Sequence, residues 1–326
     1  MNIVVKTAVA LALLASAAFA IAATPAQRYP VRPIRLIVPF ASGSATDTSA
    51  RLYAIELARL LGQQIVADNL PGAGGAIGME LLAKATPNGY TIAYAGAGPL
   101  AINGSVTGSL PYDVEKDFQP ISQAVEAPLM LAVSPASSIK SVKDLIAAAK
   151  AKPGTLTNAS AGTGTIGYLA GELFKMMSGT QIEHVPYKGG AQAALDVIAG
   201  NVQCIFDPIN GVSPHVRSGK LRGLAVTGSR RVAAFPDLPT IAEAGVPGYD
   251  VTTWGGVVAP AGVPQPIAQK LNAAMREAAA STLVKERYAV LGAEPRAGTP
   301  EAFRALIRRE TAKWAKVVQY ANAKAK

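Results

Sequence analysis

Short apolar runs alternate with amphipathic helical patterns along most of this 326-residue chain. Residues 34–38 and 90–94 are typical of buried strands, and a helical stripe between them runs through 54–61. Gly62 follows this stripe and is a natural helix stop. This strand–helix–strand order predicts parallel strands with helices packed on the faces of the sheet.

The same alternation continues through the middle of the chain. Further strands are expected at residues 129–133, 156–160, 183–187, 203–207 and 221–226. The last third has a strand at 255–259 and then helices, the final one beginning at Thr299-Pro300. We therefore expect a two-lobed α/β protein, with residues 24–123 plus 248–326 in a discontinuous first lobe and 124–247 in the second.

The first 23 residues have the pattern of a secretory signal peptide. Lys6 lies in a short leading segment, an apolar run covers residues 8–23, and small residues follow in A-x-A spacing. We expect cleavage near Ala22 or Ala23, and export of the mature protein. The rival interpretation is an uncleaved membrane anchor, for which the apolar run is short.

Charge and cysteine content limit the classes of partner. The formal net charge is +10, which favours encounter with anionic ligands. The basic residues are scattered, without a tract interleaved with aromatic residues, so no nucleic-acid partner is expected. Cys204 is the only cysteine, which excludes an intrachain disulfide, and its apolar neighbours predict a buried strand position.

Two turns rich in glycine, serine and threonine each follow a strand and open a helix. They read PFASGSATD at 39–47 and ASAGTGT at 159–165. A helix start presents free backbone N–H groups and the positive end of the helix dipole, so it can hold an anion without a buried cation. Two such turns suit the two ends of a small dianion.

The second turn also satisfies G-x-G-x-x-G at 162–167, which raises the alternative of a dinucleotide-binding enzyme. The acidic residue expected about 20 positions later is poorly matched, because Glu183 begins a strand instead of ending one. His184 and His215 lack a nucleophile motif or clustered metal ligands. We expect no catalytic residue, no metal and no cofactor.

Other segments supply candidate walls for a cleft. Ala97 and Gly98 follow a strand end, and Asp207 ends an apolar strand, at the edge where open α/β sheets place ligands. For Asp207, capping of the next segment is an equally good interpretation. The aromatic candidates, each equally acceptable as a core residue, are Phe40, Tyr168, Tyr187 and Trp254.

The chain from Tyr29 to Val318 resembles the Bug/TctC family of periplasmic solute-binding proteins of tripartite tricarboxylate transporters. The matching segments are YP at 29–30, PIRLIVPF at 33–40, Asp47 with AR at 50–51, PGAGG at 71–75, LPYD at 110–113, KDF at 116–118, LAGELF at 169–174, HVPYKG at 184–189, FD at 206–207, LPT at 238–240 and EAG at 243–245.

The resemblance implies a periplasmic-binding-protein fold of the type II kind, each lobe a mostly parallel sheet flanked by helices. It implies a non-enzymatic receptor, expected as a monomer, that closes around a small organic carboxylate and delivers it to the membrane components of a transporter. A sensor that presents its liganded form to a membrane receptor remains an alternative. Ligand contacts are implied in the first lobe at Ser42, Gly43, Ser44 and Thr46, and in the second at Ala161, Gly162, Thr163 and Thr165, with Asp207 nearby.

Two departures from the family pattern lie at or beside these contacts. The family usually has Pro-Gly-Gly where this chain has Ser42-Gly43-Ser44, so two hydroxyls are added and a rigid proline is lost. The family often has histidine where this chain has Tyr168. The two serine hydroxyls are therefore the first candidates for ligand selectivity.

Overall fold

The computed structural model describes residues 29–324, and the expected signal peptide lies outside this range. The strands are β1 (Ile34–Val38), β2 (Ile65–Asn69), β3 (Thr91–Gly96), β4 (Phe118–Val133), β5 (Thr157–Ser160), β6 (Glu183–Pro186), β7 (Cys204–Pro208), β8 (Arg222–Val226), β9 (Thr252–Pro260) and β10 (Glu294–Pro295). The helices and helical turns are α2 (Ala45–Leu61), η1 (Ala73–Gly75), α3 (Ala76–Ala83), η2 (Gly98–Ile102), α4 (Asn103–Thr107), α5 (Val114–Asp117), α6 (Val142–Ala151), α7 (Ile166–Ser178), α8 (Gly190–Ile198), α9 (Ile209–Arg217), α10 (Gln265–Ala280), α11 (Thr282–Leu291) and α12 (Pro300–Lys324).

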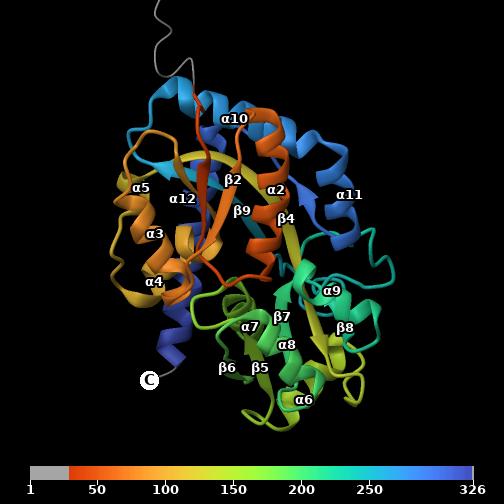
Figure 1. Cartoon of the computed structure of the whole chain (residues 1–326). Coiled ribbons are helices and arrows are strands. Elements are labelled where there is room, and N and C mark those ends of the chain that lie inside the picture. The colour runs from red at the N-terminus through yellow and green to blue at the C-terminus, as the bar shows by residue number, and fades with distance from the viewer. Residues whose placement is uncertain (1–28, 325–326) are drawn as a thin grey trace, which may run out of the picture.

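The strands form two groups joined through β4, and Figure 1 shows them as the upper and lower halves of the molecule. The order along the sheet is β2-β1-β3-β9-β4-β7-β5-β6, with β8 and β10 also paired to β4. The first lobe contains β1, β2, β3, β9 and β10, and the second contains β5 to β8. The predicted two-lobed α/β fold is confirmed.

Parallel pairing is confined to the outer strands of each lobe. β1 pairs parallel with β2 and β3, and β5 pairs parallel with β6 and β7. Around the junction the pairs are antiparallel, because β9 and β4 run in opposite directions beside these strands. The sheet is therefore mixed, and the expected mostly parallel character belongs to the strand–helix–strand units alone.

β4 passes through both lobes. Its first part, up to Pro128, pairs with β9, and its last part, from Leu129 to Val133, pairs with β7 and β8. Alternate residues of this last part face opposite sides of the sheet, as the strand period requires. Met130 belongs to one buried apolar cluster and Leu131 to the other. The core therefore lies in two layers, one on each face of the sheet.

Local sequence signals fix several helix ends. Ser44, Ser141 and Thr165 cap α2, α6 and α7 by accepting a backbone N–H in the first turn. Gly62 and Gly179 end α2 and α7 in the left-handed conformation, at φ of 68° and 64°. These ends agree with the sequence expectations, so the turns that precede α2 and α7 are where the sequence predicts them.

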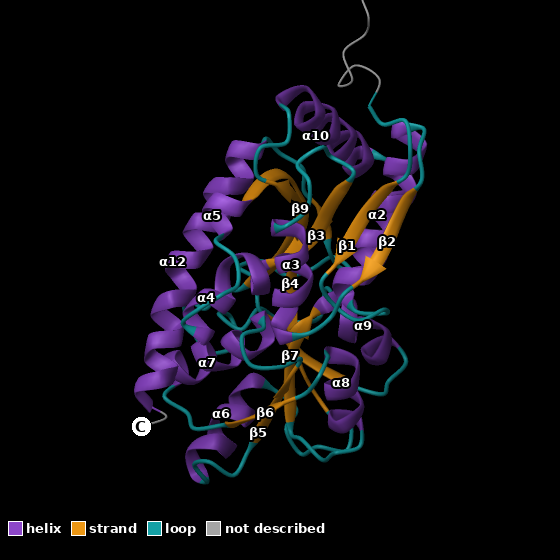
Figure 2. Ribbon diagram, turned by 60° about the vertical axis from the view of Figure 1, so that its left-hand side comes forward, coloured by secondary structure: helices purple, strands orange, loops and turns teal. Residues whose placement is uncertain are grey.

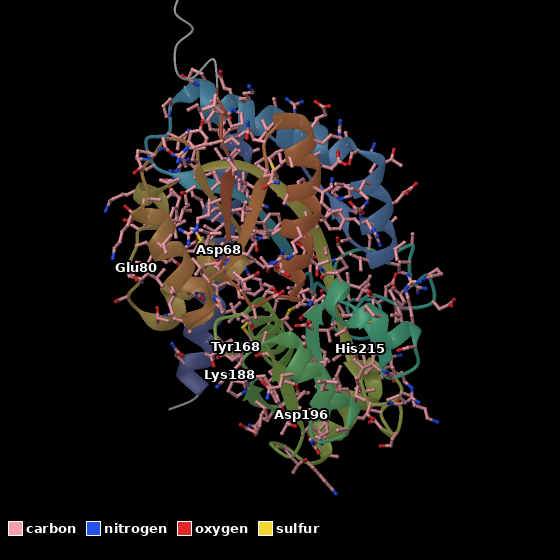
Figure 3. All side chains as sticks on the ribbon, viewed as in Figure 1. Asp68, Glu80, Tyr168, Lys188, Asp196 and His215 are labelled. Carbon is pink, nitrogen blue, oxygen red and sulfur yellow. The ribbon has the colours of Figure 1, made fainter. Side chains whose placement is uncertain are left out.

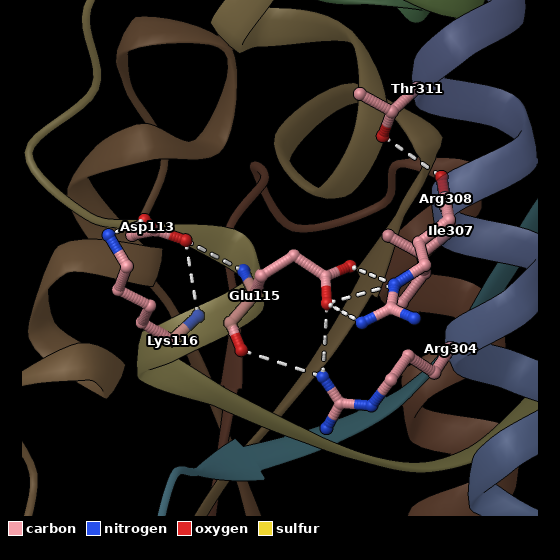
Figure 4. A network of polar contacts seen from close by, with 7 residues as sticks. All are labelled: Asp113, Glu115, Lys116, Arg304, Ile307, Arg308 and Thr311. Atoms are coloured by element: carbon pink, nitrogen blue, oxygen red, sulfur yellow. Dashed lines mark hydrogen bonds and ion pairs between the residues drawn. The ribbon is translucent and has the colours of Figure 1, made fainter.

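α12 runs along both halves of the molecule, as Figure 2 shows. It packs on β4 and η2 in the first lobe and reaches α7 in the second. Its outer face carries Arg304 and Arg308, which both pair with the Glu115 carboxylate of α5 (Figure 4). The hydrogen bond from Arg308 holds the pKa of Glu115 below its usual range. The helix thus ties the two lobes together on the side of the molecule that it covers.

Within residues 29–324, none of the helices combines the length and apolar character needed to cross a membrane.

Candidate functional site

A cavity of about 410 Å³ lies between the two lobes. Its walls come from the turns that precede α2, α7, α8 and α9, together with β3 and β9. Two other depressions, of about 280 and 200 Å³, lie along α12 and are smaller. Ten of the predicted site residues line the cavity: Phe40, Ser42, Gly43, Ser44, Thr46, Ala97, Gly98, Ala161, Thr165 and Asp207.

The turn between β1 and α2 is held from behind by Asp47. Its carboxylate accepts hydrogen bonds from the Gly43 backbone N–H at 2.9 Å, Arg51 Nε at 2.9 Å and Asn69 Nδ2 at 2.8 Å. Burial opposes ionisation, but these donors outweigh it and lower the pKa of Asp47. Ser44 Oγ accepts the Asp47 backbone N–H at 3.2 Å, which leaves its own O–H free to donate. The turn is therefore fixed before any ligand arrives.

The turn between β5 and α7 is built in a different way. Thr165 Oγ1 donates to the Gly162 carbonyl at 2.7 Å, and Ser160 Oγ accepts the Gly162 N–H at 3.1 Å. Gly162 and Gly164 take φ of 125° and 87°, which favour glycine. A Cβ on Gly167 would collide with the Phe206 carbonyl of β7. The glycines of the G-x-G-x-x-G pattern thus shape the turn and let α7 pack closely on β7.

Asp207 lies at the end of β7 in the cavity wall and is 7% exposed. Burial raises its pKa to about 7. A Cβ on Gly190 of α8 would lie 2.9 Å from its carboxyl oxygens, and one on Gly211 of α9 would lie 2.6 Å from Oδ2. The starts of two helices therefore pack against this carboxyl group because both positions lack a side chain.

Three predicted site residues do not line the cavity. Gly162 is turned into the hydrogen bonds of its own turn, and Thr163 is exposed. Tyr187 donates its hydroxyl to Asp196 Oδ2 at 2.6 Å, on the second lobe. Of the other aromatic candidates, Trp254 lines the cavity and Tyr168 does not. Ligand contact stays a prediction for every one of these residues.

The structure also brings polar residues to the cavity that the sequence reasoning did not select. They are Ser49, Tyr94, Lys188, Asn210, His215 and Thr253; Figure 3 labels Lys188 and His215 on the second lobe. Lys188 precedes Gly189-Gly190 at the start of α8, and Asn210 follows Asp207-Pro208 at the start of α9. These are two further strand-to-helix turns. Their position directly after the predicted strands 183–187 and 203–207 could have indicated from the sequence that they line the site.

Of the two histidines, His215 lines the cavity and His184 does not. His184 Nε2 lies 2.7 Å from Ser160 Oγ and its ring packs on Tyr168, but neither His184 nor Ser160 lines the cavity. Burial, with a smaller contribution from Lys175, lowers the pKa of His184 to about 4, so the ring is neutral at pH 7. Among the described residues, no group of three or more His, Cys, Asp and Glu side chains is placed to hold a metal ion.

Comparisons with known proteins agree with this geometry. The model of the tripartite tricarboxylate transporter family receptor, TctC, matches residues 49–323. Protein BugT of Bordetella pertussis is 40% identical over 302 residues, which are 92% of this chain and 93% of BugT.

Two solved structures are similar over nearly their whole length. Rpa4515 of R. palustris, solved with adipate, has a TM-score of 0.87 at 37% identity and covers 90% of this chain and 98% of its own. MatC of Rhodopseudomonas palustris, solved with bound malate, has a TM-score of 0.83 at 33% identity and covers 89% of this chain and 100% of its own. The chain therefore belongs to the TctC family of tripartite tricarboxylate transporter receptors, which are solute-binding proteins.

Proposed function

We propose that this protein is a periplasmic receptor that captures a small dicarboxylate between its lobes and delivers it to the membrane components of a tripartite tricarboxylate-type transporter. It acts as a monomer and by binding alone, without catalysis. Residues 1–23 are a signal peptide that is removed on export. We assign residues 24–123 with 248–326 to the first lobe and residues 124–247 to the second, with β4 passing from the first lobe into the second.

The observation that carries the proposal is the meeting of helix-start turns from both lobes around one cavity. The turn before α2 offers the Ser44 hydroxyl, and the starts of α2 and α7 offer free backbone N–H groups from opposite sides. Two opposed anion cradles suit a ligand with a carboxylate at each end. The cavity volume of about 410 Å³ is at the small end of the usual range for ligand sites.

The relatives support the same class of ligand. Adipate and malate, found in Rpa4515 and MatC, are both short dicarboxylates. They differ in chain length and in the hydroxyl group of malate, and what they share is a carboxylate at each end. The relatives therefore support the dicarboxylate class for this chain, and neither compound in particular. Lys188 lines the cavity and makes no ion pair within residues 29–324. It adds a positive charge that favours an anion.

Isothermal titration calorimetry with the mature protein tests the proposal. The panel contains adipate, malate, other dicarboxylates and tricarboxylates, with glucose and a divalent cation as controls. We expect micromolar or tighter binding of at least one dicarboxylate and no binding of the controls. Binding of glucose or the cation in place of every carboxylate contradicts the proposal, as does steady turnover of the bound acid.

Ser44→Gly tests the contribution of the first turn. We expect about a tenfold loss of affinity, which corresponds to one hydrogen bond to a charged ligand. Glycine is nearly as good a cap as serine, so stability changes by only a few tenths of a kcal/mol. Ser141→Gly is the matched control, because Ser141 caps α6 in the same way and lies away from the cavity. Unchanged affinity and ligand ranking in Ser44→Gly removes Ser44 from the ligand contacts.

A further inference from the structure

Asp207 is a buried carboxyl group with no hydrogen-bond partner in the described part of the chain. It is 7% exposed, lies in the cavity wall, and makes none of the hydrogen bonds or ion pairs found among residues 29–324. Buried carboxylates in proteins are normally paired or hydrogen-bonded, because an isolated charge is expensive to bury. Asp47, the buried carboxylate of the opposite turn, has four such donors, on Ser42, Gly43, Arg51 and Asn69.

No side chain packed around Asp207 supplies a compensating charge, so the starts of α8 and α9 alone favour its ionised form. β4 places Met130 beside it as its strand neighbour. α8 and α9 contribute Gly190 and Gly211, whose missing side chains leave room for the carboxyl oxygens. Lys188 and His215 line the same cavity from these two sides, but neither forms an ion pair with Asp207. Its environment is that of a neutral acid more than that of a carboxylate.

A dicarboxylate in this cavity brings negative charge close to Asp207. Two carboxylates that share a dry site do not both remain ionised, because each raises the proton affinity of the other. A protonated carboxyl group, in contrast, has one O–H to donate. Closing the cavity therefore favours a proton on Asp207 at the moment that the ligand arrives.

We propose that Asp207 contacts the bound acid as a neutral carboxyl group and donates its O–H to a ligand carboxylate, so that binding takes up a proton from solvent. This inference rests on the proposed function. In addition to that function, it states that the complex holds one proton more than the free protein and the free ligand. The proton forms an O–H bond on Asp207, and the ligand enters as the fully ionised dianion.

The pH range of the effect follows from the free protein. Burial raises the pKa of Asp207 to about 7, and a bound anion raises it further. At pH 6 the group is already largely protonated, so binding takes up little. At pH 8 it is mostly ionised before binding, so close to one proton is taken up per ligand. The affinity then falls about tenfold per pH unit above 7.

Calorimetry of adipate and malate at pH 6 and pH 8, in two buffers with different heats of ionisation, measures the proton count directly. We expect a count near zero at pH 6 and near one at pH 8 in the wild-type protein. Asp207→Asn keeps the size and a donor group but cannot titrate. We expect it to bind with a count near zero at both pH values and with an affinity that no longer changes with pH.

Asp68→Asn is the matched control, because Asp68 pairs with Arg35 at the surface of the first lobe, away from the cavity. We expect it to keep the wild-type proton count and pH dependence. Wild-type binding without proton uptake at pH 8 overturns the inference and leaves the proposed function intact. Loss of binding at every pH in a folded Asp207→Asn variant also overturns it, since an ionised carboxylate is then required. Failure of every carboxylate to bind the wild-type protein overturns the proposed function itself.

Discussion

Asp47 is the single residue on which the first turn of the site most depends. It is 3% exposed and joins the turn backbone, α2 and β2 through Gly43, Arg51 and Asn69. Asp47→Asn removes the charge and some of these bonds. We expect it to lower the free energy of unfolding at pH 7 by about 1–3 kcal/mol, the usual cost of leaving buried partners unsatisfied.

The contribution of Asp47 to the free energy of unfolding should increase with pH. The pKa of Asp47 is lowered in the folded protein from its usual value of 3.8, so its contribution is present above pH 4 and is lost as pH falls through the folded value. Urea unfolding of the variant and the wild type should therefore differ most at neutral pH and least near pH 3. Glu80→Gln, which breaks an exposed pair with Lys84, serves as control and should cost under about 0.5 kcal/mol. An equal gap between Asp47→Asn and wild type at both pH values argues against this role.

Among single residues, those of the site could be predicted where one short sequence segment contains both the strand end and the helix start. Ser44 and Thr165 follow strands and cap helices, so local sequence indicates both the turn and its exposed donors. Tyr94 and Trp254 reach the cavity because β3 and β9 pair with each other. Trp254 was named from the sequence as a candidate wall residue, whereas the position of Tyr94 depends on a strand pairing that periodicity does not show. Tyr187 was selected as an aromatic wall candidate, and its bond to Asp196 holds it outside the cavity.

Among the elements, α12 is held by buried packing on one face and by exposed ion pairs on the other, and mutations can separate the two contributions. Trp314 is fully buried, and its Nε1 donates to Glu310 Oε2 at 3.0 Å. Trp314→Ala should lower the free energy of unfolding by about 3–5 kcal/mol, because it leaves a large cavity. Arg308→Ala breaks the exposed pair with Glu115 and should cost under about 1 kcal/mol. Urea denaturation of both variants measures the difference, and similar losses in the two would show that the ion pairs hold α12 in place.

The elements that the sequence predicted well are those with uninterrupted local patterns, such as β1 and α7. β4 was predicted only at residues 129–133, although the strand begins at Phe118. Pro120 and Pro128 interrupt the pattern, and proline normally argues against a central strand. The pairing of β4 with β9 shifts register just after Pro120, and this irregularity accommodates the missing N–H. Such an adjustment needs the partner strand, so residues 118–128 gave no local strand signal.

For the whole molecule, the cavity between two lobes joined through β4 predicts a change of shape on binding. The turns before α2 and α7 can both touch one small ligand only if the lobes approach it from opposite sides. Small-angle scattering should therefore show a smaller radius of gyration with a saturating dicarboxylate than without it. Glucose at the same concentration is the control and should leave the radius unchanged.

The same closure should appear as a gain in stability, because a ligand that binds only the folded protein stabilises it by about 2.7 kcal/mol at a hundredfold excess over Kd. The two measurements separate binding from closure. A rise in Tm together with a smaller radius means that the ligand draws the lobes together. A rise in Tm at constant radius means that the cavity is already formed in the free protein, which contradicts the closure but not the binding. Because β4 joins the two lobes, we expect the movement to lie where it passes from the pairing with β9 to the pairing with β7.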